Sequence, residues 1–160
     1  MSTQDFSTTL VVNNTPEEAF KAVTNVRGWW SEEIVGGTAK LNDEFDYHYL
    51  DVHKCRMKLI EVIPNKKVVW FVLENYFKFT KDTTEWTGTT IVFDIIEKDG
   101  KTHVRLTHQG LVPEYECFDI CSNAWTNYIQ ESLGNLITTG VGKPNRSDNP
   151  QTEDEARLAR

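Results

Sequence analysis

The order of segments along the chain restricts the fold more than any single motif does. A strand-like segment at 6–12 and a helix starting at Pro16 precede a long run of strand-like segments, and one apolar-striped helix, about 118–139, comes near the end. Only that last helix is long enough to cover the sheet that these strands would form. The order therefore predicts an α+β fold in which a curved antiparallel β-sheet wraps around a long C-terminal helix.

Period-two alternation marks the first strand, because Phe6, Thr8, Leu10 and Val12 share one face. Thr15 can cap the helix that follows, Pro16 suits its first position, and Glu18 has the capping-box spacing. The helix breaks at 25–28, and Trp29 and Trp30 come directly after in a turn or second short helix. Two short helices are therefore expected between the first two strands.

From Glu44 onward the pattern indicates sheet. The residues that alternate onto one face are Phe45, Tyr47 and Tyr49, then Cys55, Met57 and Leu59, then Ile91, Phe93 and Ile95, and finally Val104, Leu106 and His108. The segment 68–73 is apolar on both faces, so its parity leaves open whether Trp70 or Phe71 faces the helix. The stretch 74–87 has no clean period, and we expect a loop whose aromatic side chains fold back over the protein. Lys98-Asp-Gly-Lys101 predicts a hairpin turn.

A helical period of about 100 degrees per residue gives the last helix one buried side. The residues on that side are Cys121, Ala124, Trp125, Tyr128, Ile129, Ser132, Leu133 and Leu136. Gly140 and Gly142 are suitable stop signals. We therefore expect one domain over residues 1–142 and a polar, flexible tail over 143–160.

Composition disfavours several classes of function. The chain of 160 residues has 24 acidic and 17 basic residues, for a net charge of −7, which disfavours nucleic acid and anionic lipid headgroups as partners. No apolar run approaches the roughly 20 residues of a membrane helix, and the start lacks the pattern of a signal peptide. Three cysteines cannot all pair within one chain. We expect a reduced, cytoplasmic protein that is not an integral membrane protein.

Several segments, taken in their order, resemble the START-like superfamily, and within it the single-domain proteins named for homology to the activator of the heat-shock-protein-90 ATPase. They are Trp29-Trp30, Gly36-Gly37, Glu61-Val-Ile-Pro64, Leu106-Thr-His-Gln-Gly110, and Ala124-Trp125 followed by Leu133 and Leu136. The family commonly has Gly where this chain has Ala124. The resemblance implies a helix-grip fold, with a cavity that relatives use for lipids, sterols, polyketides or hormones. It implies no shared reaction and no cofactor.

Large aromatic side chains are the best candidates for a binding site. Four tryptophans lie in four segments that this fold would gather around one cavity, and each combines an apolar body with an N–H donor. The alternative is that they simply fill the core. The residues predicted to bind a small hydrophobic or amphipathic ligand are Trp30, Tyr47, Tyr49, Met57, Trp70, Trp86, His108, Trp125 and Tyr128.

Other chemistry is weakly supported by the sequence. His53, Cys55, Cys117 and Cys121 could share a zinc ion, but no CxxC pair occurs, so no metal site and no catalytic residue is assigned. A cyclase- or hydrolase-like enzyme, with His108 beside Arg105 as its acid or base, stays open as an alternative. A co-chaperone module that contacts a chaperone is a further alternative. Ile60 and Val62 indicate an apolar strip on the outer sheet face that could form a homodimer.

Overall fold

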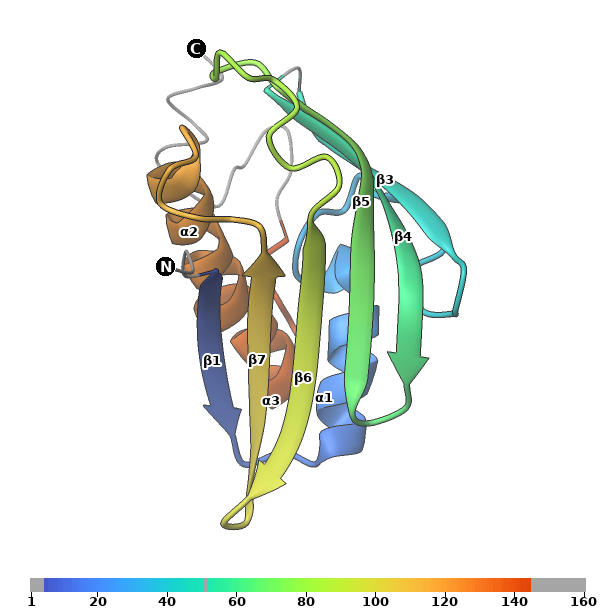
Figure 1. Ribbon diagram of the computed structural model, residues 1–160. Helices are drawn as coiled ribbons and strands as arrows, with labels where there is room; N and C mark the ends of the chain where they lie inside the picture. Colours follow the sequence, from blue (N-terminus) through green and yellow to red (C-terminus); the bar gives the residue numbers. More distant parts are fainter. Residues whose placement is uncertain (1–4, 51, 145–160) are drawn as a thin grey trace.

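The computed structural model describes residues 5–50 and 52–144 and has seven antiparallel strands in one curved sheet (Figure 1). The order across the sheet is β1-β7-β6-β5-β4-β3-β2, so the first strand pairs with the last. The strands are β1 Phe6–Val12, β2 Val35–Gly36, β3 Glu44–Tyr49, β4 His53–Ile63, β5 Lys67–Phe77, β6 Thr90–Lys98 and β7 Lys101–Gln109. The expected α+β helix-grip fold is confirmed. The expected tail lies outside the described residues from position 145 onward.

Two short helices connect β1 to β2, as expected. Helix α1, Pro16–Thr24, begins with a capping box in which the Glu18 amide donates to Thr15 Oγ1 (3.1 Å) and the Thr15 amide donates to Glu18 Oε1 (3.0 Å). The 3-10 helix η1, Val26–Gly28, follows directly. In Figure 1 all helices lie on one face of the sheet, which leaves the other face without a covering layer among the described residues.

The C-terminal helix is continuous but not uniform. It consists of α2, Phe118–Asn127, a π-helical segment η2, Tyr128–Leu133, and α3, Gly134–Thr139, and Gly140 ends it with a φ of 85°. A π-helical turn contains more residues than an α-helical turn, so it rotates the buried face. Ile137 is therefore the buried residue of the last turn, whereas the predicted Leu136 is only half-buried. No helix in the described ranges is long and apolar enough to cross a membrane.

A shift in register between β4 and β5 explains the stretch that lacked a clean period. Arg56 pairs with Glu74 while Met57 pairs with Val72, so Leu73 is an extra residue in β5. The bulge reverses the parity of the strand and turns Asn75 and Phe77 toward the helix side. The expectation that all of 74–87 forms a loop is therefore wrong for 74–77, which complete β5. The same register buries Trp70 and leaves Phe71 on the outer face.

A second bulge lies in β4, between Leu59, which pairs with Trp70, and Glu61, which pairs with Val69. Ile60 is the extra residue and is 46% exposed, whereas Val62 packs against the core. The predicted outer strip of Ile60 and Val62 is therefore wrong, because the bulge places these two side chains on opposite faces. Both bulges also increase the local bending of the sheet.

Candidate functional site

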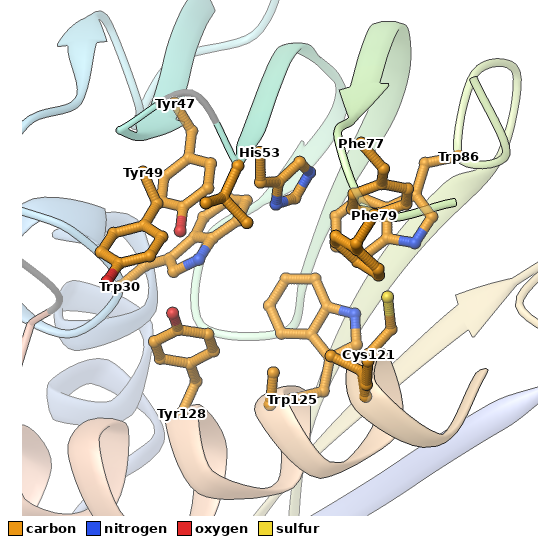
Figure 2. A pocket seen from close by; sticks show the side chains of 13 residues that line it. Trp30, Tyr47, Tyr49, His53, Phe77, Phe79, Trp86, Cys121, Trp125 and Tyr128 are labelled. Carbon is orange, nitrogen blue, oxygen red and sulfur yellow. The ribbon is translucent and has the colours of Figure 1, made fainter. Parts of the chain in front are cut away.

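One cavity lies between the sheet and the first half of the C-terminal helix (Figure 2). Its walls come from the segment just after η1, from β3, the start of β4 and the residue before it, the end of β5, the β5–β6 loop (residues 78–89), helix α2 and the first residue of η2. The lining side chains are Trp30, Tyr47, Tyr49, Val52, His53, Phe77, Phe79, Trp86, Ile120, Cys121, Ala124, Trp125 and Tyr128. Figure 2 shows the aromatic rings facing one another across the space, so the cavity has an almost entirely aromatic wall.

The cavity is narrow. About 460 Å³ between these side chains is free of atoms when the open mouth is included, but the centre of a water-sized sphere can occupy only about 40 Å³ of it. A single water needs roughly 10–15 Å³ by that measure, and drug-sized ligands usually occupy sites of about 300–1,000 Å³. In this conformation the cavity has room for only a few water molecules, and a larger ligand requires the walls to separate.

Trp30 is positioned by the segment around η1. Arg27 in that helix donates from Nε to the Ile34 carbonyl (2.8 Å) and from Nη2 to the Gly36 carbonyl (2.7 Å), which ties the helix to β2. The Trp30 ring then stacks on Tyr47, with centroids 4.2 Å apart and planes 17° apart, and it lies 5.2 Å from the Trp125 ring. These contacts join sheet and helix at one end of the cavity, where Figure 2 also shows the hydroxyl groups of Tyr47, Tyr49 and Tyr128.

Trp125 is held by a buried hydrogen-bond chain. Its Nε1 donates to His108 Nδ1 (3.1 Å), and because an indole nitrogen can only donate, Nδ1 carries no proton. Neutral His108 therefore donates from Nε2 to Thr89 Oγ1 (2.8 Å), which in turn donates to the Trp86 carbonyl (2.6 Å). Burial, with repulsion from His53, lowers the pKa of His108 to about 3. The chain links β7, the β5–β6 loop and α2.

Trp86 stands beside Trp125, with ring centroids 5.7 Å apart and planes 10° apart. Two glutamates attach the loop that carries Trp86 to the segment just before α2. One lies in the loop and accepts from that segment, and the other lies in that segment and accepts from the loop. Buried Glu85 accepts from the amides of Glu116 (2.9 Å) and Cys117 (3.2 Å). Glu116 accepts through Oε1 from the amides of Lys81 (3.0 Å) and Asp82 (3.3 Å). We call these four hydrogen bonds the glutamate latch.

His53 places a polar ring in the aromatic wall. It packs edge-to-face against Trp86, with centroids 4.8 Å apart, and lies 4.4 Å from the Phe77 ring. Its Nε2 is 2.8 Å from Asn75 Oδ1. Burial lowers the pKa of His53 to about 4, although the hydrogen bond to Asn75 acts in the opposite direction, so the ring is neutral at neutral pH.

Six of the nine predicted site residues line the cavity, namely Trp30, Tyr47, Tyr49, Trp86, Trp125 and Tyr128. The other three do not. Met57 and Trp70 lie deeper in the core, where Trp70 stacks behind Trp30 with centroids 5.7 Å apart. His108 lies behind Trp125 and has both ring nitrogens hydrogen-bonded. Sequence alternation identified the inner face of the sheet but not the depth of a residue beneath it.

Seven lining residues are absent from the predicted set. They are Val52, His53, Phe77, Phe79, Ile120, Cys121 and Ala124. His53 has the same strand parity as Cys55 and Met57, so alternation could have identified it. Phe77 could not be found in this way, because its inward direction depends on the bulge at Leu73.

The four residues weighed as zinc ligands do not gather. His53 bonds Asn75, and within the described residues no group of three or more His, Cys, Asp or Glu side chains could hold a metal ion. Burial is the main cause that raises the pKa of the Cys121 thiol well above its usual value, and a hydrogen bond with Cys117 raises it further. This raised pKa disfavours a reactive thiolate.

A wider hollow of about 600 Å³ by the same measure lies on the outer face of β3, β4 and β5. Charged side chains line much of it, and Arg56 approaches Asp46 within the lining (3.8 Å). Such a shallow, solvated surface offers little apolar area that a small apolar molecule could cover. The aromatic cavity is the stronger candidate despite its smaller volume.

Solved structures share this fold at low sequence identity. The Aha1 dimer from Colwellia psychrerythraea has a TM-score of 0.68 at 21% identity, with 87% of this chain and 99% of that chain covered. DynU16, from the dynemicin biosynthetic locus, has a TM-score of 0.61 at 12% identity, with 85% of this chain but only 48% of that chain covered. SSP2350 from Staphylococcus saprophyticus has a TM-score of 0.59 at 16% identity, with 88% of this chain and 96% of that chain covered.

These likenesses show the fold, and at such identities they carry no activity with them. No protein with a curated description matches the sequence. A family model gives the more specific result, because it matches residues 13–138, which is most of the 160-residue chain. The protein therefore belongs to the family described as activator of Hsp90 ATPase homolog 1-like protein.

Proposed function

We propose that this protein binds a small, largely apolar or amphipathic molecule in the cavity between the sheet and helix α2. The observation that carries the proposal is the convergence of aromatic rings from segments far apart in the chain on one space that reaches the surface. A sheet packed only for stability has no need of such a space, because protein interiors are usually filled to crystal-like density. Proteins with this fold commonly bind hydrophobic ligands, which supports the same proposal.

The present volume limits what can bind without movement. A ligand larger than a few water molecules must displace part of the wall, and the β5–β6 loop is the segment best placed to move. Phe79 in that loop is only half-buried, and two of the four hydrogen bonds of the glutamate latch are exposed to solvent. Binding therefore requires the loop to separate from α2, and the free-energy cost of this separation lowers the affinity for large ligands.

Filling the cavity from the helix tests the proposal. Ala124 lines the cavity and is half-buried, so Ala124→Phe places a ring in the space without removing a core side chain. The unchanged protein, incubated with a lipid extract, should show a stoichiometric adduct by native mass spectrometry. Because the added ring occupies the ligand's space, we expect the adduct to fall by at least about tenfold in Ala124→Phe, which corresponds to 1.4 kcal/mol of binding free energy.

The matched control is Asn123→Phe, which adds the same ring to the exposed side of the same helix. This variant should keep the adduct. Equal adducts in both variants would place the ligand elsewhere on the protein. The lack of an adduct with the unchanged protein across a broad range of extracts would remove the proposed function.

Four further ideas go beyond the cavity. The family is named for a chaperone activator, and the Colwellia relative is described as a dimer. For this chain, contact with a chaperone, formation of a homodimer and a cytoplasmic location stay predictions, and a cyclase- or hydrolase-like activity stays an alternative. The proposed binding rests on the cavity lining within this chain and uses none of these further ideas.

A further inference from the structure

Two polar atoms in the aromatic wall have no oxygen or nitrogen partner within the described residues. The first is Trp86 Nε1, which is buried and has only the Cys121 thiol beside it as an acceptor. In Figure 2 it faces the Cys121 sulfur, a weak acceptor. Leaving a buried donor unpaired costs about 1–3 kcal/mol. An atom of this kind on a cavity wall is a place where a ligand acceptor gains a full hydrogen bond.

The second atom is His53 Nδ1. The Asn75 amide nitrogen lies 3.5 Å from the Thr83 carbonyl, which can only accept, so the Asn75 oxygen faces His53 and accepts from its Nε2–H. Nδ1 is then an unprotonated acceptor. The His53 side chain makes no other hydrogen bond within residues 5–50 and 52–144, and Figure 2 shows this nitrogen on the side of the ring that faces the helix. The cavity thus presents a free acceptor as well as a free donor.

Trp70 shows why position matters. Its Nε1 is also buried without a partner among the described residues, yet Trp70 is fully buried and does not line the cavity. Aromatic rings surround it instead, with Phe93 and Phe45 centroids at 4.8 and 5.1 Å. The unpaired N–H of Trp70 has no route to a ligand, whereas that of Trp86 borders the space where a ligand would lie.

We propose that the cavity recognises a flat aromatic molecule with a hydroxyl or amine that donates to His53 Nδ1 and a carbonyl that accepts from Trp86 Nε1. This inference rests on the proposed function and narrows its ligand class. The stacked rings of the wall favour a planar guest, because planar faces pack closely against tryptophan and tyrosine. The two polar atoms distinguish such a guest from a plain hydrocarbon or an acyl chain, which would leave both atoms unpaired.

A series of three probes tests the ligand side. The parent is a naphthalene with a hydroxyl group at one end and an acetyl group at the other. Its methyl ether lacks the donor, and its ethyl analogue lacks the acceptor, while both keep nearly the same size. By calorimetry we expect each change to weaken binding by about three- to tenfold, which is the usual worth of one hydrogen bond.

Variants test the protein side. Trp86→Phe keeps an aromatic ring but removes the N–H, so it should erase the preference for acetyl over ethyl and keep the preference for hydroxyl over methyl ether. His53→Phe should do the reverse. Trp70→Phe is the matched control, because it removes the other unpaired indole N–H at a position away from the cavity. It should change neither preference.

The outcomes separate the two proposals. Equal binding of all three probes would overturn the inference about polar recognition and leave the hydrophobic cavity intact. If no probe binds, the inference is also overturned, and the lipid-extract adduct then decides whether any ligand is bound. Should a variant fail to fold, the three probes on the unchanged protein still give the two preferences that the inference requires.

Discussion

His53 and His108 are both held in the neutral form, but by different surroundings. His108 is fully buried and donates to Thr89, while its other nitrogen accepts from Trp125. His53 borders the cavity and donates to Asn75. In each case burial is the main cause of the lowered pKa, because a charged imidazolium loses its hydration there.

Stability should therefore fall as the solution becomes acidic. In the unfolded chain a histidine takes up a proton below pH about 6.5, whereas folded His108, with a pKa of about 3, stays neutral. Protons then favour the unfolded state between these values, and at about pH 5 His108 alone lowers the free energy of unfolding by roughly 2 kcal/mol. Chemical denaturation at a series of pH values measures this slope.

Two variants isolate the histidine contribution from that of the carboxylates. His108→Gln should be less stable at neutral pH, because a buried hydrogen-bond chain is broken, but its stability should depend less on pH between about 7 and 4. His48→Gln changes an exposed histidine and should keep the slope of the unchanged protein. A slope in His108→Gln as steep as in the unchanged protein would contradict the neutral assignment.

For single residues, the sequence predicted which side chains face the inside of the fold better than it predicted which of them line the cavity. Trp125 was expected to bind a ligand and does line the cavity, whereas His108 was grouped with it and instead supports it from behind. Both share the inner face, and alternation cannot tell which inward residue lies beside an empty space. That distinction depends on packing between segments far apart in the chain.

Among the elements, the β5–β6 loop has the largest influence on the cavity. It carries Phe79 and Trp86, and the glutamate latch fixes it to the start of α2. The side chain of Cys117 does not cap that helix, and the Glu85 carboxylate accepts from the amides of Glu116 and Cys117, the two residues just before it. A carboxylate also interacts favourably with the positive end of the helix dipole. The loop and the helix therefore stabilise each other.

Removing Glu85 should loosen the loop. In Glu85→Ala, the amides of Glu116 and Cys117 lose their acceptor, and we expect a loss of about 1–3 kcal/mol in the free energy of unfolding. Hydrogen exchange in residues 79–88 should become faster than in the rest of the sheet. Glu114→Ala, which removes the same charge from an exposed position nearby, is the control. Unchanged exchange in this loop would show that the latch does not hold it.

The irregular parts of the elements were the least predictable. Period-two alternation gave the faces of β3, β6 and β7 correctly, but it lost the phase after Leu73 and again at Ile60, because each bulge inserts one residue. The π-helical segment had the same effect on the last helix, where the buried face moved from Leu136 to Ile137. A bulge depends on pairing with the neighbouring strand, which no single segment encodes.

For the molecule as a whole, the order of elements was sufficient to predict the helix-grip fold. A sheet with one buried face needs a cover, and the C-terminal helix was the only long apolar-striped segment available. The width of the space between sheet and helix could not be predicted in the same way. Large rings can fill such a space or line it, and here Trp70 does the first while Trp30 and Trp125 do the second.

The five tryptophans make the central claim directly measurable. Each indole N–H gives its own signal in a proton–nitrogen NMR spectrum, and single Trp→Phe variants assign them. During titration with the hydroxy-acetyl naphthalene, the signals of Trp30, Trp86 and Trp125 should shift, because these rings line the cavity, while those of Trp29 and Trp70 stay in place. Shifts confined to surface amides, with all five indole signals unchanged, would contradict binding in the cavity.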